Sequence, residues 1–504
     1  MTGDQQYAKA SAKYFATGMQ GGGGPFYVNR LDRPGRFEIA TSQYVTGHSG
    51  AVLDFDWSPF DDSMLATASE DTTIRIWSIP DDWEPTDENG NAKEGAHLTE
   101  SAAELKGHKK KVTLLRYHPT ANNTLLSTGA DYTVKVWDVE SSQAVTSFDD
   151  LTNLVHDIVW DHRGDMFACS CKDKNVRMVD GRTGKMESEI VKAHDGTKSV
   201  KLVYANDTGK FFTFGASKQS AREIKVWDIK NLSEPIHTES VDTAAGAMIP
   251  LWDADTNILY LCGKGDGTVR LYEYEDKSPF IFKLSDGFRS NIPGKGYCMV
   301  PKRGLNIMKH ETTRILKVTN STGIHPLNFY VPRKSDAFQD DIFPETPAAT
   351  PACTFAEWMA GTSKDPVLMS LDPAVRGANG GAKGAEKKPK VFKSVPQLSK
   401  DLAAAQKRIE QLESNSGSAP APAAAVNNVV NDEAQKRIEF LESKLKETEE
   451  AEKSKLAETE EALKRIEALE GKLAETQGKL AETEGSQTRI EILESKLMEN
   501  NIEY

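Results

Sequence analysis

The sequence predicts an all-β, seven-bladed propeller, followed by a packed C-terminal arm, a flexible linker and an α-helical coiled coil. Three observations support this prediction. Blocks of short apolar strands and turn residues recur along much of the 504-residue chain. The residues that close these blocks follow one another after 42, 48 and 45 positions from the second block onward. A six-residue, helix-forming motif recurs near the C-terminus. A period of about 40 to 45 residues built from short strands is typical of propeller blades, whose radial closure leaves few exposed sheet edges.

The blocks share a fixed spacing between an aspartate and the residue that closes the block six positions later. The pairs are Asp71 and Trp77, Asp131 and Trp137, Asp173 and Val179, and Asp266 and Tyr272. Two blocks also begin with Gly-His, with the histidine 29 residues ahead of its tryptophan. This is the pattern of a WD repeat, and we expect the histidine, aspartate and tryptophan to form a hydrogen-bonded set within a blade. The predicted structural residues are His48, Asp71, Trp77, His108, Asp131 and Trp137. A catalytic role for the histidines is disfavoured because the set recurs without a nucleophile beside it.

The predicted blades follow one another along the chain. Leading strands are expected within 12–40, and six repeat units follow, ending near 79, 139, 180, 228, 274 and 318. We expect the last blade to combine N-terminal strands with a segment near 315–331, which would close the ring. The predicted domains are a propeller at 1–330, an extension packed on it at 331–373, a flexible linker at 374–431 with a short helix near 398–414, and a coiled-coil segment at 432–504. Prolines and aromatic residues favour an ordered extension, and Gly-, Ala- and Lys-rich composition favours a flexible linker.

The C-terminal segment repeats the motif Arg-Ile-Glu-x-Leu-Glu. The copies lie at 408–413, 437–442, 465–470 and 489–494. With isoleucine at heptad position a and leucine at d, the arginine and the final glutamate fall at g and e, where ion pairs join neighbouring helices. The predicted oligomerisation residues are Arg437, Ile438, Leu441, Glu442, Arg465, Ile466, Leu469, Glu470, Arg489, Ile490, Leu493 and Glu494. The pattern leaves the number of helices and their orientation open. The alternative to a coiled coil is a single solvated helix that is stabilised by ion pairs along its surface.

Composition narrows the class of protein. The net charge is −13, of which residues 432–504 contribute −8, so no basic surface of the kind that binds nucleic acid is indicated. The five cysteines have neither disulfide nor metal-site spacing, which favours a reduced cytoplasmic protein. No cofactor-binding motif, metal-ligand spacing, secretory signal or membrane-spanning run is indicated.

Several segments resemble the coronin family, whose members are actin-binding propeller proteins with a C-terminal coiled coil. These segments are GHSGAVLDFDWSPF (47–60), GHKKKV (107–112), CKDKNVR (171–177), LYLCGKGDGTVRLYE (259–273), VPKRGLN (300–306) and VPRKSDAFQDDIFPET (331–346). The last three are more specific than a generic WD repeat. The resemblance spans about residues 40–360 and the architecture of the tail. The chain departs from the family at its N-terminus, where members usually carry a further segment. We expect this departure to affect ring closure and the affinity for actin.

The resemblance implies a non-enzymatic regulator of the actin cytoskeleton in the cytoplasm and cell cortex. The propeller would bind F-actin, and the coiled coil, usually trimeric in the family, would cross-link filaments; a dimer or a tetramer stays open. The implied further partners are the actin-related-protein nucleating complex, which forms filament branches, and cofilin, which drives filament turnover. The alternative is a generic WD-repeat scaffold for protein complexes without direct actin binding, because fold alone does not give function. An enzyme is disfavoured because no nucleophile–base or metal constellation is found.

Actin filaments are acidic, so the contact residues should be exposed lysines and arginines. Lys109, Lys110 and Lys111 follow Gly107-His108 directly and are the strongest candidates. The further candidates are Arg75, Lys135, Lys172 and Lys174. For each of them the alternative is an ordinary solvated charge.

Overall fold

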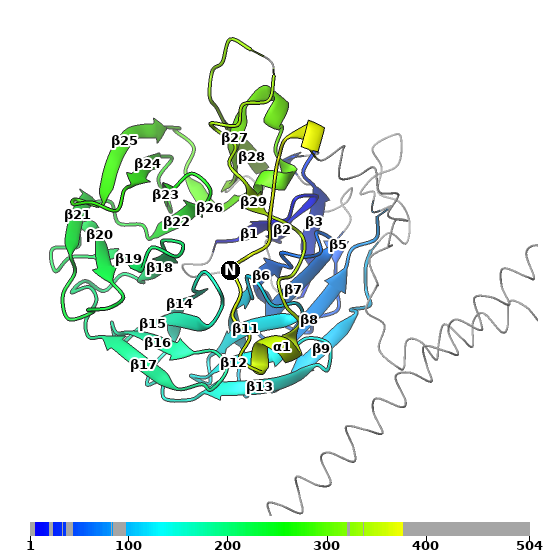
Figure 1. Cartoon of the computed structure of the whole chain (residues 1–504). Helices are drawn as coiled ribbons and strands as arrows, with labels where there is room; N and C mark the ends of the chain where they lie inside the picture. Colours follow the sequence, from blue (N-terminus) through cyan, green and yellow to red (C-terminus); the bar gives the residue numbers. More distant parts are fainter. Residues whose placement is uncertain are drawn as a thin grey trace, which may run out of the picture. The chain divides into compact units, whose positions relative to one another are not determined.

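The computed structural model describes residues 6–19, 24–32, 34–36, 44–81, 83, 97–319, 323–335 and 337–375. Within these ranges, seven four-stranded antiparallel sheets are arranged radially around a common axis (Figure 1). The all-β, seven-bladed propeller predicted from the sequence repeat is confirmed. Each blade is numbered below in chain order, and its strands are given from the axis outward.

The first four blades are built almost entirely from consecutive strands. Blade 1 holds β1 (Ala8–Ala10), β2 (Tyr14–Gly18), β3 (Phe26–Arg30) and β5 (Tyr44–Val45). Blade 2 holds β6 (Val52–Trp57), β7 (Met64–Ser69), β8 (Thr73–Ser78) and β9 (Ala103–Lys106). Blade 3 holds β10 (Val112–Tyr117), β11 (Thr124–Gly129), β12 (Val134–Asp138) and β13 (Gln143–Phe148). Blade 4 holds β14 (Val155–Trp160), β15 (Met166–Cys171), β16 (Val176–Asp180) and β17 (Met186–Ile190).

The remaining blades lead to a C-terminal segment with little regular structure. Blade 5 holds β18 (Lys201–Tyr204), β19 (Lys210–Ala216), β20 (Arg222–Asp228) and β21 (His237–Asp242). Blade 6 holds β22 (Met248–Asp253), β23 (Ile258–Gly263), β24 (Val269–Tyr274) and β25 (Ile281–Phe288). Blade 7 holds β26 (Gly294–Met299), β27 (Glu311–Thr319), β28 (Gly323–Tyr330) and β4 (Gly35–Arg36). The 3₁₀ helices η1 (Lys302–Gly304) and η2 (Ile307–Lys309) join β26 to β27, and β29 (Thr346–Pro347), α1 (Phe355–Met359) and β30 (Leu368–Met369) follow blade 7.

The ring closes between blade 7 and a short strand from the N-terminal region. Arg36 of β4 pairs with Gly323 of β28, and Gly35 pairs with Ile324. The other N-terminal strands form blade 1 rather than joining the last blade, so the N-terminal contribution to ring closure is smaller than predicted. The physical reason is burial: β2 and β3 lie between blade 2 on one side and blade 7 on the other, so they form a blade of their own, and only β4 pairs with the last blade.

The core consists of apolar layers between neighbouring blades. One layer joins Phe26 of blade 1 to Phe55, Leu65 and Trp77 of blade 2, and equivalent clusters lie at the other blade boundaries. The second strand of a blade is therefore buried on both faces; all six residues of β11 are buried. This explains why these strands are continuous runs of small and apolar residues, such as MLATAS and TLLSTG, rather than alternating patterns.

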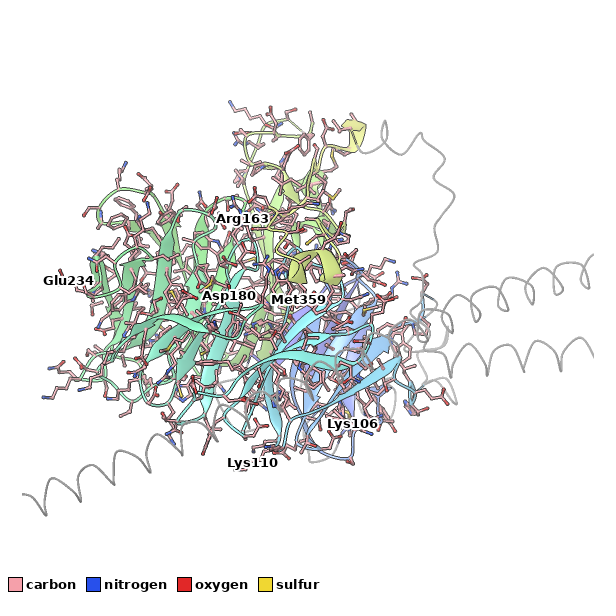
Figure 2. All side chains as sticks on the ribbon, turned by 60° about the horizontal axis from the view of Figure 1, so that its bottom comes forward. Lys106, Lys110, Arg163, Asp180, Glu234 and Met359 are labelled. Carbon is pink, nitrogen blue, oxygen red and sulfur yellow. The ribbon has the colours of Figure 1, made fainter. Side chains whose placement is uncertain are left out.

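The connections between strands fall on two opposite faces, because successive strands of an antiparallel sheet run in opposite directions. One face carries the turns from second to third strands and the loops that lead to the next blade, including 107–111 and 172–175. We name it the lysine face. The opposite face carries the loops 118–123 and 161–165 and contacts the C-terminal segment, and we name it the arm face. Figure 2 shows Lys110 and Arg163 on these two opposite sides of the ring.

Candidate functional site

A buried hydrogen-bond network connects the repeat residues of blade 2. His48 Nδ1 lies 2.8 Å from Asp71 Oδ2, and its Nε2 lies 2.7 Å from Thr67 Oγ1. Trp77 Nε1 donates to the same Thr67 hydroxyl at 2.9 Å. Because an ionised carboxylate only accepts, Nδ1 carries the proton, and Nε2 accepts from Thr67. Gly47 precedes the histidine because a Cβ there would lie 2.9 Å from the Trp77 ring.

The same network recurs in blades 3 and 5. His108 lies 3.1 Å from Asp131 and 2.7 Å from Ser127, which accepts from Trp137 at 2.7 Å. In blade 5 a third set is present, in which a glutamate replaces the aspartate. Its members are His194, Glu223, Thr213 and Trp227. The sequence spacing identified Trp227 as the closing residue of its block. It missed the bridging hydroxyl residues, His194 and Glu223, because neither the bridging position nor a glutamate belongs to the aspartate-to-tryptophan spacing.

The protonation states of these networks follow from burial and hydrogen bonding. Burial lowers the pKa of His48 and of His194, so both imidazoles are neutral near pH 7. Burial by itself would raise the pKa of Asp71, but hydrogen bonds from Thr73 and His48 outweigh it and lower the pKa to about 2. These side chains are saturated with partners inside the blade, so they brace the fold and offer no group to a substrate.

Two of the four repeat aspartates have other partners. Asp173 accepts from Arg177 at 2.8 Å and from Thr152 at 2.9 Å. Asp266 accepts at 2.9 Å from Arg222 of the neighbouring blade, which also pairs with Asp242 at 2.6 Å. Neither block has a histidine at the position that corresponds to His48, 23 residues before the aspartate, where the chain has Asp150 and Thr243. Arginine therefore takes the place of histidine as the partner of the aspartate in these two blades.

The three consecutive lysines lie on the loop from β9 to β10, on the lysine face. Lys109, Lys110 and Lys111 are all exposed. The backbone N–H of Lys109 donates to Asp131 at 2.7 Å, which anchors the loop to the brace of blade 3. The Lys110 ammonium lies 5.7 Å from the ring centroid of Tyr132, and Lys111 pairs with Glu70 at 3.4 Å. The loop is therefore held at its base while its cationic side chains project outward.

The other candidate cations are less available. Arg75 is half-buried and pairs with Glu104 at 3.4 Å, and Lys135 donates to Ser147 at 3.1 Å. Lys174 donates to the backbone oxygen of Asp195 in the next loop. Lys172 is exposed at the turn between β15 and β16, on the same face as the lysine run. The structure thus places these residues on or near one face, but engages three of the four in local contacts.

The inner strands enclose a network of charged residues around the axis. Arg116 of blade 3 bridges Asp54 of blade 2 at 3.2 Å and Asp157 of blade 4 at 3.1 Å. Lys201 of blade 5 lies 3.9 Å from Asp157 and donates to the His156 oxygen at 2.8 Å. These pairs tie the inner strands of four blades together.

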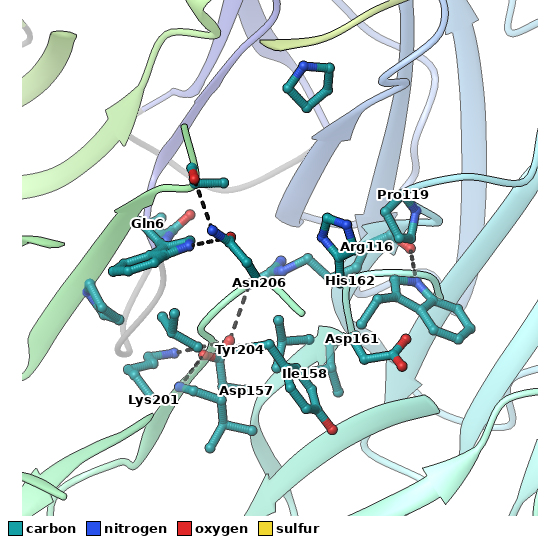
Figure 3. Close-up of a pocket in the computed structure, with 18 of the residues that line it drawn as sticks. Gln6, Arg116, Pro119, Asp157, Ile158, Asp161, His162, Lys201, Tyr204 and Asn206 are labelled. Carbon is teal, nitrogen blue, oxygen red and sulfur yellow. Dashed lines mark hydrogen bonds and ion pairs between the residues drawn. The ribbon is translucent and has the colours of Figure 1, made fainter. Parts of the chain in front are cut away.

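A cavity of about 370 Å³ lies at the arm-face end of this axis (Figure 3). Its walls come from the inner strands of blades 3 to 6 and the loops that follow them, from Gln6 and Lys9 at the inner strand of blade 1, and from Pro347 and Pro366 of the C-terminal segment. Its lining includes Trp252, Tyr204 and Asp161. Burial raises the pKa of Asp161 to about 6, although the Met166 N–H donates to its carboxylate at 3.2 Å. No feature of the repeat pattern pointed to this cavity.

The C-terminal segment contacts the arm face of blades 3 and 4. Trp358 of α1 is fully buried and lies between the Trp160 ring, at 6.0 Å, and the Arg182 guanidinium, at 5.0 Å. Arg182 also donates to the Trp358 oxygen at 2.6 Å and to the Thr362 oxygen at 2.9 Å. The helix begins with a capping box between Thr354 and Glu357.

The predicted linker from residue 376 onward and the predicted coiled-coil residues lie outside the described residues. They include the oligomerisation residues Arg437, Ile438, Leu441, Glu442, Arg465, Ile466, Leu469, Glu470, Arg489, Ile490, Leu493 and Glu494. Within the described ranges, no cluster of three or more His, Cys, Asp or Glu residues is arranged to hold a metal ion. No helix in this same part of the chain combines the length and apolar character needed to span a membrane.

The ring of four-stranded blades and the recurring His–hydroxyl–Trp braces define a WD-repeat β-propeller. Consistent with this class, residues 40–78 and 99–138 match a family model described as "WD domain, G-beta repeat", and residues 324–366 match one described as a type of WD40 repeat. The crystal structure of the WD40 domain from Toxoplasma gondii coronin superposes with a TM-score of 0.67 at 32% sequence identity, covering 74% of this chain and 93% of that one.

Curated relatives narrow the class to one family. The coronin-like protein crn1 of Schizosaccharomyces pombe is 38% identical over 352 residues, covering 70% of this chain and 56% of that protein. Human coronin-2A is 37% identical over 358 residues, covering 70% of this chain and 66% of that protein. The matches thus span between about half and two thirds of the curated relatives. The chain belongs to the coronin family.

Proposed function

We propose that this coronin-family protein is a non-enzymatic regulator of the actin cytoskeleton that binds actin filaments through the lysine face. The observation that carries the proposal is the exposed run of Lys109, Lys110 and Lys111 on an anchored loop of a propeller with coronin ancestry. Exposed cations on a rigid base suit an acidic filament, since electrostatic attraction raises the encounter rate and little loop ordering is required on binding.

Charge reversal tests this face. In the Lys109→Glu/Lys110→Glu/Lys111→Glu variant, we expect co-sedimentation with actin filaments to weaken by about tenfold or more at low salt, and the salt dependence of binding to fall. The matched control is Lys185→Glu/Lys230→Glu/Lys277→Glu, which changes the net charge equally but alters exposed residues of arm-face loops. Equal weakening in both variants would show a general charge effect, and full binding by the folded lysine-run variant would remove this site.

The alternative is a WD-repeat scaffold that binds other proteins and not actin, because the braced blades alone specify a fold and not a ligand. Co-sedimentation of the unmodified full-length protein separates the two functions. Saturable pelleting with filaments at low salt supports actin binding. Absence of pelleting at low salt would favour the scaffold.

The C-terminal motif supports a second part of the proposal: self-association through residues 432–504, as a trimer, a dimer or a tetramer. Linking two or more weakly binding propellers raises avidity by about 10² or more without new contacts. We expect truncation after residue 400 to yield a monomer in sedimentation equilibrium, with much weaker filament bundling. A truncated protein that bundles filaments as well as the full chain would contradict this role.

Further partners are proposed from the family alone. They are the actin-related-protein nucleating complex and cofilin, and the proposed location is the cytoplasm, at the actin-rich cortex. These interactions are assayed by adding the protein to branched-nucleation and filament-severing reactions. No effect on either reaction at concentrations that saturate filaments would count against them.

A further inference from the structure

The arm-face cavity carries a carboxylate that its surroundings do not neutralise. The Asp161 carboxylate accepts hydrogen bonds from backbone N–H groups only, from Met166 at 3.2 Å and from Gly164 and Asp165 of its own loop. No lysine, arginine or histidine in the described part of the chain forms an ion pair with it. The aspartate is largely buried, and the nearby Asp165 charge adds repulsion. Asp165 itself is neutralised by Arg182 at 2.6 Å. A buried charge without a counter-ion is costly, so Asp161 is a group for which an added cation would supply the missing partner.

The cationic side chains of the same cavity are, in contrast, already paired. Arg116 is held by Asp54 and Asp157, and Lys201 by Asp157 and a backbone oxygen. Lys9 pairs with Asp56 at 3.4 Å. An anionic ligand would have to break these bridges between blades, whereas a cationic ligand would leave them intact. Charge complementarity therefore favours a cation.

The aromatic walls of the cavity suit an organic cation rather than a metal ion. Trp252 lines the cavity with its indole fixed by a 2.9 Å hydrogen bond from Nε1 to Asn206, whose amide donates to the Ala254 oxygen at 2.8 Å. Tyr204 lines the same cavity; burial, and secondarily the negative charge of Asp161, raise its pKa. Aromatic faces and prolines favour guanidinium and alkyl groups over a hydrated metal. The volume of about 370 Å³ accommodates one long side chain with its flanking backbone.

We propose that this cavity is a peptide-binding site that accepts an arginine or lysine side chain of a partner protein, with the cation paired to Asp161 and its alkyl chain against Trp252 and Tyr204. The site lies on the opposite face from the lysine run, so it is independent of the proposed filament contact. One propeller could then hold a filament on one face and a basic segment of another protein on the other.

The direct test uses the full-length protein and capped peptides of the sequence Gly-Pro-Arg-Pro-Gly, observed by ligand-detected NMR at pH 7.5. A matched peptide carries citrulline, which keeps the shape of arginine without its charge. We expect saturable binding of the arginine peptide and about tenfold weaker binding of the citrulline peptide. Equal affinities, or no saturable binding of the arginine peptide at millimolar concentration, would overturn the proposal. Binding of inorganic phosphate at the cavity in preference to the arginine peptide would also overturn it.

Two variants assign the binding to the carboxylate. Asp161→Asn keeps an acceptor for the Met166 N–H and should weaken the arginine peptide about tenfold. Asp207→Asn, an exposed aspartate of the next arm-face loop that does not line the cavity, should bind as the unmodified protein does. If both variants retain full affinity, Asp161 is not the partner of the cation and the proposal fails.

A pH series adds a readout that a structural role alone would not give. The titratable and charged groups around Asp161 include Asp165 and His162 from its own loop and Tyr204 from β18, and the cavity is also lined by Asp157 and the paired cations Lys9, Arg116 and Lys201. With the Asp161 pKa at about 6, lowering the pH from 7.5 to 5.5 should weaken the arginine peptide about fourfold. The Asp161→Asn variant should lose this dependence, and an equal pH dependence in the variant would contradict the assignment.

Discussion

Replacing Asp161 by asparagine should stabilise the propeller at neutral pH. Burial raises the pKa of this carboxyl from an ordinary 3.8 to about 6, so the folded state holds the charged form at a free-energy cost. Asparagine removes the charge and keeps the acceptor for the Met166 N–H. A residue whose removal raises stability is the expected behaviour of a group retained for binding rather than for folding.

The magnitude follows from the displaced pKa. A difference between 3.8 and about 6 corresponds to about 3 kcal/mol at pH 7.5, because each pH unit is worth about 1.36 kcal/mol. Because the folded-state pKa is raised, the charged carboxylate destabilises the folded state. This loss of stability is fully present above pH 6 and decreases as the pH falls toward 3.8. The advantage of the variant should therefore shrink from about 3 kcal/mol at pH 7.5 to about 1 kcal/mol at pH 4.5.

Urea unfolding of the full-length protein, followed by tryptophan fluorescence at several pH values, measures this advantage. Asp207→Asn serves as the control, since Asp207 forms only an exposed ion pair with Arg163 at 3.3 Å, which is worth about 0 to 1 kcal/mol. An Asp161→Asn variant that is less stable than the unmodified protein at pH 7.5 would refute the reasoning. A stability gain that does not change with pH would refute it equally.

Two further predictions concern the brace of blade 2 and the C-terminal segment. Thr67→Val removes the hydroxyl shared by His48 and Trp77 and should lower the free energy of unfolding by about 2 to 4 kcal/mol. Thr67→Ser keeps the hydroxyl and should lower it by less than about 1 kcal/mol. Equal losses for the two variants in urea unfolding would show that the hydroxyl is not the cause. Arg182→Ala removes the cation–ring contact with Trp358 and the hydrogen bonds to the Trp358 and Thr362 oxygens. Limited proteolysis should then cleave within 351–366 about tenfold faster or more, whereas the control Lys185→Ala should be cleaved at the rate of the unmodified protein. Unchanged cleavage would mean that the segment is held by other contacts.

The repeat spacing was sufficient to predict the propeller and its seven blades because tryptophan and Gly-His are rare enough in combination to mark a register. The bridging hydroxyls were not predictable in the same way: Thr67 and Ser127 are common residues within apolar strands, and only the pairing of β7 with β8 and of β11 with β12 places them beside an indole. Glu223 escaped notice because its longer side chain reaches His194 from a strand rather than from a turn.

The candidate sites were predicted less completely than the fold. Sequence could place the lysine run on a loop, but not show that Lys174 and Arg75 would be engaged by neighbouring groups. No motif or residue spacing distinguishes Asp161 in the sequence. The cavity that it lines also includes Tyr204 of the next blade and two prolines of a segment that begins after the last blade, and no local pattern reports such distant neighbours.

The pairing of β4 with β28 has a consequence for how the protein is made. Residues 35–36 must wait for residues 323–324 to leave the ribosome before blade 7 receives its outer strand. At about 5 to 20 residues per second, this interval is on the order of tens of seconds. During synthesis the inner strands of blades 1 and 2 are already present, but the apolar side of blade 1 that meets β26 stays uncovered. The nascent ring is therefore an open chain of blades with two unsatisfied ends, and chaperone dependence should be greatest just before the last blade emerges.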